Sequence, residues 1–132
     1  MTAAYRPGGL RSDLSGHSDW ECVGGVFRAL GSPLRVGIVV LLEERPRSVT
    51  ELVQALDVSQ PLVSQHLRVL RAAGMVRARR QGREVFYSLT DADVPALVAS
   101  AGRQVREHPP AGLRRVPALT DGDAAALPPP GA

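Results

Sequence analysis

Hydrophobic residues recur at intervals of three and four positions through the middle of the chain, which is the spacing of amphipathic helices. The second such stretch, over 33–44, is apolar nearly all round, so we expect it to lie at the buried centre. In all, the spacing predicts helices over 19–30, 33–44, 49–56 and 59–73, and a last helix from a cap at Thr90 or Asp91 to about Glu107.

Capping residues indicate where several of these helices begin and end. Ser32 stands before a proline, which is favoured at the first helical position. Ser48 and Glu51 form the pattern of a capping box, in which each side chain bonds to the other residue's amide. Ser59 is a second candidate N-cap, and Gly74 is suited to end the fourth helix.

After Gly74 the hydrophobic period shortens from that of a helix to that of a strand. Residues 75–79 and 84–89 are predicted to be strands, and 80–83 to be the turn that joins them, with Gly82 at the strained position. The expected order is helix-helix-helix-helix-hairpin-helix. This is a mainly α fold with a small β-hairpin, of the winged helix-turn-helix class.

Both ends of the chain lack this periodicity. Residues 1–18 are rich in Gly, Ser and Arg, and residues 109–132 hold six of the 11 prolines. We expect a disordered N-terminal arm and a disordered Pro-rich tail on either side of one domain over 19–108. A domain of this size buries a limited core, which makes oligomerisation an attractive source of further burial.

The charge of the chain is unevenly distributed. All 16 basic side chains are arginines, and six of them lie between Ser59 and Arg83, where there is no acidic residue. Because the whole chain carries +3, the remainder carries −3. A compact cationic segment on a mildly acidic body indicates a polyanionic partner, for which nucleic acid is the usual candidate. The plainer alternative is a solvated basic face.

Several classes of protein are disfavoured by what the sequence lacks. The longest apolar run, over 38–42, is far shorter than the roughly 18 residues of a membrane span, and no export signal is evident. One cysteine cannot form an internal disulfide framework. No catalytic triad, phosphate-binding glycine loop or paired carboxylates can be assembled, so we expect a cytoplasmic protein that is not an enzyme and has no membrane partner.

The helices over 49–56 and 59–73 form the pattern of a helix-turn-helix, because a short helix and a tight turn precede a longer helix with polar first turns. Gln, Ser and Arg side chains there suit base edges of the major groove, and the arginines of the following hairpin suit the phosphate backbone. The predicted DNA-binding residues are Ser59, Gln60, Ser64, Gln65, His66, Arg68, Arg71, Arg79, Arg80 and Arg83.

Each of these residues also has a structural explanation. Ser59 can act as a helix cap alone, and Gln65 and His66 can be simply solvated. Arg68 and Arg71 can pair with acidic residues on the body of the domain. The combination of reading helix and basic hairpin is more specific than any single member.

Three stretches of the chain resemble the ArsR/SmtB family of winged-helix repressors. They are Ser32-Pro33-Leu34-Arg35, then 58–70 (VSQPLVSQHLRVL), then 81–87 (QGREVFY). The resemblance extends from about Trp20 to Glu107. It implies a homodimer held by the first and last helices, which binds an imperfect palindrome in operator DNA and is released by an inducer, often a metal ion.

Family members that bind zinc use pairs of residues near the two ends of the last helix. Mapped onto this chain, the first pair falls on Asp91 and Asp93 and the second on Gln104 and Glu107, so that both histidine positions of the family are lost. His108 is the nearest replacement, and the candidate zinc ligands are Asp91, Asp93, Glu107 and His108. Pro95 predicts that the helix begins at Asp93 or bends there. Capping of the helix is the alternative role for the two aspartates.

The family's cysteine-based metal site has no counterpart, because residues 47–50 contain no cysteine. A separate group of possible metal ligands consists of His17, Asp19, Glu21 and Cys22. A lone buried cysteine beside a solvated acidic arm explains the same residues, and a redox role for Cys22 is a further alternative. Three functional alternatives stay open at this point: a winged-helix protein-interaction module, a regulator of this type that senses no metal, and a nonspecific RNA-binding protein.

Overall fold

The computed structural model describes residues 14–109 and 111–112, and within them the chain forms five helices and one three-stranded sheet. This is the mainly α winged helix-turn-helix fold that the sequence predicts. The helices are α2 (His17–Ala29), α3 (Pro33–Glu44), α4 (Val49–Leu56), α5 (Gln60–Ala72) and α6 (Asp93–Glu107), and the strands are β1 (Arg47–Ser48), β2 (Val76–Gln81) and β3 (Glu84–Leu89).

The helix ends follow the capping signals in most places. Ser48 Oγ accepts a hydrogen bond from the amide of Glu51 at 3.2 Å, and the Glu51 carboxylate reaches back to the Ser48 amide, so the predicted capping box is confirmed. Ser59 Oγ accepts from the amide of Leu62. Ser32 occupies the predicted N-cap position of α3, but its side chain makes no capping bond. Helix α2 begins at His17, two residues before the predicted start, so residues 17–18 do not belong to a disordered arm. Residues 1–13 of that predicted arm, and 110 and 113–132 of the predicted tail, lie outside the described residues.

The sheet contains one strand, β1, that the hydrophobic pattern does not predict. β1 pairs antiparallel with β3, with Arg47 opposite Tyr87, so that the strand order is β1-β3-β2. The turn between β2 and β3 is also shorter than predicted, because Gln81 pairs directly with Glu84. Arg80 and Gln81 therefore belong to β2, and only Gly82 and Arg83 form the turn. Gly82 has a φ of +65°, which glycine adopts at little cost.

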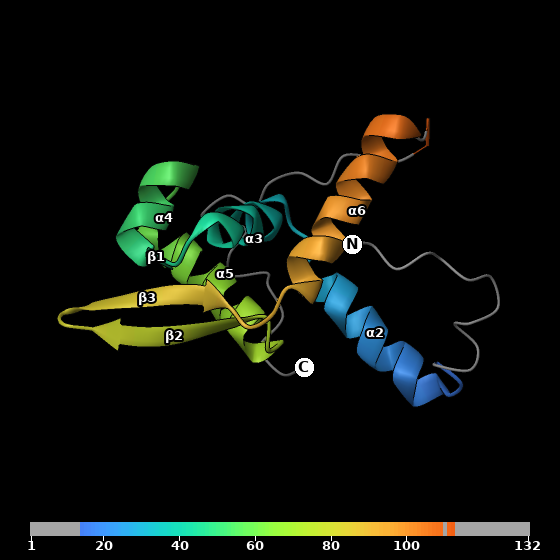
Figure 1. Ribbon diagram of the computed structural model, residues 1–132, viewed down its shortest axis with the longest axis horizontal. Coiled ribbons are helices and arrows are strands. Elements are labelled where there is room, and N and C mark those ends of the chain that lie inside the picture. Colours follow the sequence, from blue (N-terminus) through green and yellow to red (C-terminus); the bar gives the residue numbers. More distant parts are fainter. Residues whose placement is uncertain (1–13, 110, 113–132) are drawn as a thin grey trace.

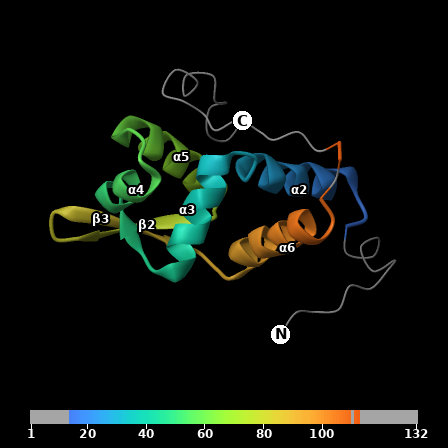
Figure 2. The ribbon, with the colours of Figure 1, turned by 90° about the horizontal axis from the view of Figure 1, so that it is seen from above.

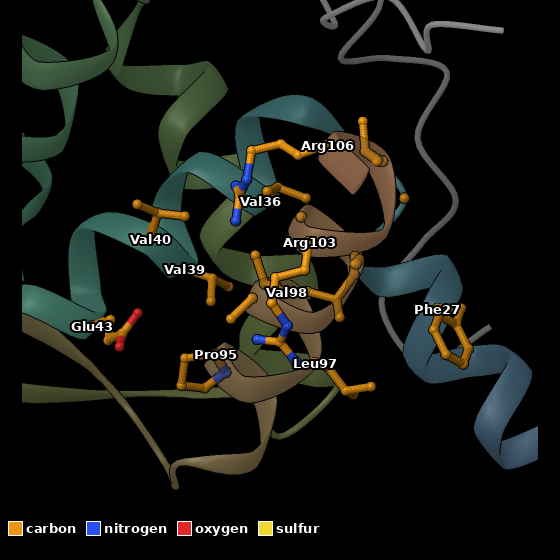
Figure 3. Close-up of a pocket in the computed structure, with 16 residues that line it drawn as sticks. Phe27, Val36, Val39, Val40, Glu43, Pro95, Leu97, Val98, Arg103 and Arg106 are labelled. Carbon is orange, nitrogen blue, oxygen red and sulfur yellow. The ribbon is translucent and has the colours of Figure 1, made fainter. Parts of the chain in front are cut away.

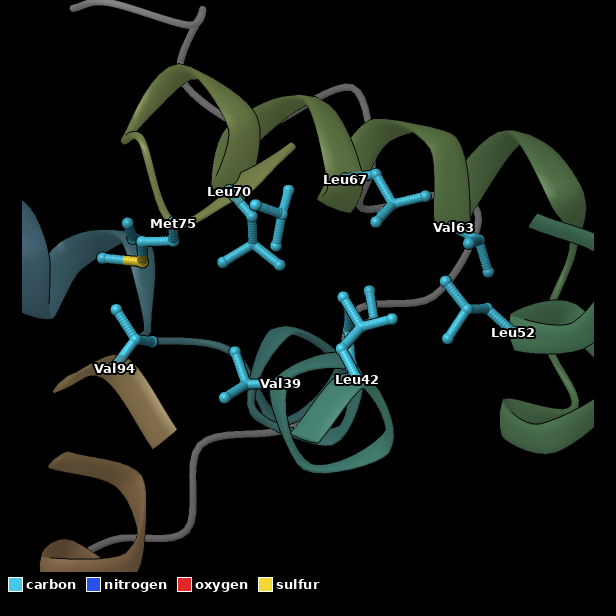
Figure 4. Close-up of a cluster of buried hydrophobic side chains, with 11 residues drawn as sticks. Val39, Leu42, Leu52, Val63, Leu67, Leu70, Met75 and Val94 are labelled. Carbon is cyan, nitrogen blue, oxygen red and sulfur yellow. The ribbon is translucent and has the colours of Figure 1, made fainter. Parts of the chain in front are cut away.

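The core surrounds α3, as expected for a helix that is apolar on most sides. Val39 and Leu42 of α3 lie among buried side chains from α4, α5 and α6 (Figure 4). The cluster also includes Leu52, Val63, Leu67, Leu70, Met75 and Val94. Helices α4, α5 and α6 and strand β3 all contact α3. The position of the helix-turn-helix is thus set by one central helix.

The two ends of the domain carry different elements. The β2–β3 hairpin projects at one end, and α2 and α6 lie at the opposite end in both views (Figures 1 and 2). Helices α4 and α5 lie beside the hairpin, and α3 lies between them and α6 (Figure 2). Among the described residues no single helix is long and apolar enough to cross a membrane. Helices α2 and α3 together reach the length and the apolar composition of a membrane span, but the chain bends by 85° between them.

The turn that joins α4 to α5 is strained at one residue. Asp57 has φ 54° and ψ 49°, and it is the one non-glycine residue with positive φ in the described part of the chain. Asp57→Val should lower the free energy of unfolding by roughly 1–2 kcal/mol, because a β-branched side chain is poorly tolerated in this region. Thermal unfolding measures the change. Asp57→Gly is the matched control, and an equal loss in both variants would show that the carboxylate, not the backbone, matters.

Candidate nucleic-acid interface

Helices α4 and α5 form the predicted helix-turn-helix. Asp57 ends α4 in the left-handed conformation, with its amide donating to the Val53 carbonyl, and Ser59 caps α5 two residues later. This tight connection brings α5 against α4. Leu62 and Val63 of α5 are buried in the core. The opposite side of α5 is left facing outward.

The outward side of α5 carries one stripe of polar side chains. Gln60, Ser64, Arg68 and Arg71 are all exposed, and their spacing of four, four and three places them on a single face of the helix. Gln65 is half-buried beside this stripe. Donors and acceptors that suit base edges therefore lie in a row on the helix that follows the turn.

His66 does not belong to this exposed stripe, so its predicted place among the DNA-contacting residues is wrong. Its exposed fraction is 0%, because it lies on the same face as the core residues Leu62 and Leu70. Burial, with a further contribution from the positive charge of Arg35, lowers the pKa of His66 to about 4. The imidazole is therefore neutral and enclosed at neutral pH, and it cannot contact a base from this position.

The hairpin presents its arginines on both faces. Arg79 and Arg80 are consecutive residues of β2 and point to opposite sides of the strand, and Arg83 lies in the turn; all three are exposed. The ion pairs among the described residues, Arg45–Glu51 and Arg47–Glu44, involve none of them. These three charges are thus available to phosphate groups.

One further arginine of the hairpin was missed as a candidate. Arg77 is exposed and lies two residues before Arg79, on the same face of β2, and its Nε donates to Ser88 Oγ at 3.4 Å. The alternation of side chains along a strand was sufficient to find it. With Arg77 included, one face of β2 carries two positive charges.

The four candidate zinc ligands do not come together within one chain. Asp93 begins α6 and Glu107 ends it, so the two pairs are separated by the length of the helix, about 21 Å. The Asp91 carboxylate accepts a hydrogen bond from the amide of Asp93 at 2.9 Å, which is the capping role considered as the alternative. The helix begins at Asp93, as Pro95 predicts, but its N-cap is Ala92, so the predicted cap at Thr90 or Asp91 is wrong.

The second group of candidate ligands is spread along α2. His17 contacts the Trp20 ring at 4.7 Å between centroids, and Asp19 accepts a bond from the Gly16 amide. Cys22 is an exposed free thiol. Nowhere in the described residues do three His, Cys, Asp or Glu side chains lie close enough to hold a metal ion.

A large apolar groove lies at the end of the domain away from the hairpin. It has a volume of about 950 Å³ and is formed by α2, α3 and α6 (Figure 3). Phe27 from α2 and Leu97 and Val105 from α6 line it, and these side chains are 58%, 38% and 50% exposed. Trp20, further along α2, is 54% exposed. Large apolar side chains gathered in this way mark an interaction surface.

Comparisons with known proteins agree with this arrangement. Residues 32–78 match the family described as "Bacterial regulatory protein, arsR family". The chain is 51% identical over 81 residues to the HTH-type transcriptional repressor SmtB of Mycobacterium tuberculosis, a match that spans 61% of this chain and 60% of the SmtB chain. It is 38% identical over 93 residues to a biofilm growth-associated repressor of Xylella fastidiosa, spanning 70% of this chain and 80% of that protein.

A solved structure gives the same result for the fold. The homodimeric winged helix-turn-helix DNA-binding domain of a Mycobacterium bovis protein superposes with a TM-score of 0.63 at 25% identity, covering 86% of this chain and all of that one. The matched segments include the turn, α5 and the start of β2, which carry the exposed polar stripe. The chain therefore belongs to the arsR family of bacterial regulatory proteins.

Proposed function

We propose that the protein is a homodimeric transcriptional repressor that binds operator DNA through α5 and the β2–β3 hairpin. The observation that carries this proposal is the segment from Gln60 to Arg83, which contains no acidic residue and exposes six arginines. Two of them lie on α5 beside outward-facing Gln and Ser side chains, and four lie on the β2–β3 hairpin. The relatives named above are repressors, which supports repression and not activation for this chain.

The two parts of this surface have different tasks in the proposal. Gln60 and Ser64 on the first turns of α5 hydrogen-bond to base edges in the major groove, where they give sequence selectivity. The hairpin arginines bind phosphates along the backbone, which gives affinity for any sequence and fixes the register of α5. Arg68 and Arg71, further along α5, can serve either bases or phosphates.

Dimerisation follows from the apolar side chains that one chain leaves exposed. Phe27 and Trp20 on α2 and Leu97 and Val105 on α6 would be covered by the same helices of a second copy, in an interface related by a two-fold axis. Two α5 helices related by such an axis would bind two half-sites of an imperfect palindrome. The homodimeric structure from M. bovis supports this assembly.

A metal inducer would need ligands from two chains. Asp91 and Asp93 of one protomer, with Glu107 and His108 of its partner, are the donors that the chain offers, and all four are exposed. Zinc in proteins favours sites with more Cys and His than this set contains, and Asp91 is already engaged as a cap. DNA binding weakened by stoichiometric zinc and restored by a chelator would support a zinc-responsive repressor. Indifference to both would leave a repressor with another inducer.

Arg83→Ala tests the role of the hairpin. The variant should bind both operator and random DNA less tightly, because a phosphate contact is lost that does not depend on sequence. The slope of log K against log salt concentration should fall by about 1 in fluorescence anisotropy titrations. Arg45→Ala is the control for the lost charge, because it removes one positive charge from a side chain that is already paired with Glu51. An unchanged slope for Arg83→Ala would remove Arg83 from the interface.

A further inference from the structure

Arg47 lies where three elements next to the proposed DNA-binding surface meet. It is the first residue of β1, which contains two residues and connects α3 to α4. Its backbone pairs with Tyr87 of β3, one of the two strands of the hairpin. Ser48, the next residue, caps α4, the first helix of the helix-turn-helix. One dipeptide therefore joins the central helix, the helix-turn-helix and the hairpin.

The side chain of Arg47 holds the last turn of α3 by two hydrogen bonds. Its Nε donates to the Leu41 carbonyl at 3.0 Å, and its Nη2 donates to the Glu44 carboxylate at 2.6 Å. The last four carbonyls of a helix have no partner within that helix, and the last turn of α3 contains no basic residue. Arg47 therefore supplies from β1 a C-terminal interaction that α3 itself does not provide.

β1 is also the strand that extends the hairpin to a three-stranded sheet. A hairpin of two strands is only marginally stable in water, so its third strand matters for its order. β3 lies between β1 and β2, and the pairing continues across the sheet from Ser48 to Phe86 and from Phe86 to Arg79. The point at which Arg47 holds α3 is thus one residue along the sheet from the row that contains a hairpin arginine.

We propose that Arg47 is a positioning residue for DNA binding, which fastens β1 to the end of α3 and so fixes the direction of the hairpin relative to α5. This inference rests on the proposed repressor function. Helix α3 contacts both α5 and β3, so it is the common support for the two parts of the interface. The Arg47 side chain is only 12% exposed and is bonded to Leu41 and Glu44, so it acts through the hairpin arginines and not on DNA itself.

The salt dependence of DNA binding distinguishes positioning from direct contact. Anisotropy titrations of Arg47→Met with DNA from upstream of its own gene should show a slope of log K against log salt concentration that is lower by about 2 or more, whereas one lost phosphate contact lowers it by about 1. Arg45→Met is the matched control, because it removes an equal charge two residues away from a side chain paired with Glu51, and it should leave the slope unchanged.

A double-mutant cycle with Arg83→Ala gives the second readout. Because both changes act on the same phosphate contacts, Arg83→Ala should lower the slope less in the Arg47→Met background than in the wild type. A slope that is unchanged in Arg47→Met, or that falls by about 1 and adds fully to the effect of Arg83→Ala, would overturn the proposal.

Hydrogen exchange without DNA keeps the test independent of the proposed function. The amides of Arg47 and Tyr87 should exchange slowly in the wild type and rapidly in a folded Arg47→Met. If Arg47→Met does not fold, the wild type decides, since exchange at these amides as fast as at Gly82 and Arg83 of the turn would overturn the proposal. Failure of the repressor function would appear differently, as wild-type protein that has slow exchange at β1 but binds no DNA.

Discussion

Leu97→Asp should convert the protein to a monomer and weaken its binding to a DNA fragment with two half-sites by roughly 100-fold or more. Leu97 of α6 lines the apolar groove between α2, α3 and α6 and is 38% exposed in one chain. A second copy can therefore cover it without repacking the core. A carboxylate buried there would lack a partner. Loss of the second protomer removes the gain that two linked binding modules provide.

Analytical ultracentrifugation and anisotropy titrations measure the two effects together. Leu97→Met preserves an apolar side chain of similar volume and should remain dimeric with wild-type affinity. Val105→Asp, on the same helix and 50% exposed, should reproduce the loss. A dimeric Leu97→Asp would place the interface elsewhere than on α6.

The free energy of unfolding should fall by roughly 3 kcal/mol between pH 7 and pH 4 through His66 alone. The pKa of His66 is lowered from 6.5 to about 4 in the folded chain, first by burial and then by the charge of Arg35. The unfolded chain therefore binds more protons than the folded chain between these two values. Stability from the neutral imidazole is complete above pH 6.5 and is lost as the pH falls toward 4.

Urea unfolding at a series of pH values measures this slope. His66→Leu removes the titrating group while leaving an apolar side chain at a core position, and the curve of this variant should be flatter over the same interval. The difference between the two curves isolates His66 from the carboxylates that titrate near pH 4. Parallel curves would mean that the ring is solvated in the folded protein.

Local signals predicted the elements that depend on local interactions. Ser48 and Glu51 form the capping box that their spacing indicates, and Pro95 fixes the start of α6 at Asp93. The burial of His66 could also have been predicted, because it falls on the same helical stripe as Leu62 and Leu70. Its polar side chain suggested an exposed position, whereas its place on the apolar face of α5 buries it.

Features that depend on contacts between residues distant in sequence could not be predicted from local signals. β1 contains two residues and exists because Arg47 and Ser48 pair with Tyr87 and Phe86 some 40 positions later. The positive φ of Asp57 arises from the connection of α4 to α5, which only the packing of both helices fixes. The burial of Arg35 was likewise hidden, because in sequence it is an ordinary basic residue in the first turn of a helix.

Sequence-specific binding is measured by the affinity of the wild-type protein for DNA from upstream of its own gene, compared with a fragment of the same length and composition in scrambled order. We expect two chains per site and tighter binding to the native fragment by a factor of at least about 10³ at physiological salt. The affinity for both fragments should fall steeply as salt increases. Equal affinity for the two fragments, or no binding to either, would contradict a sequence-specific repressor.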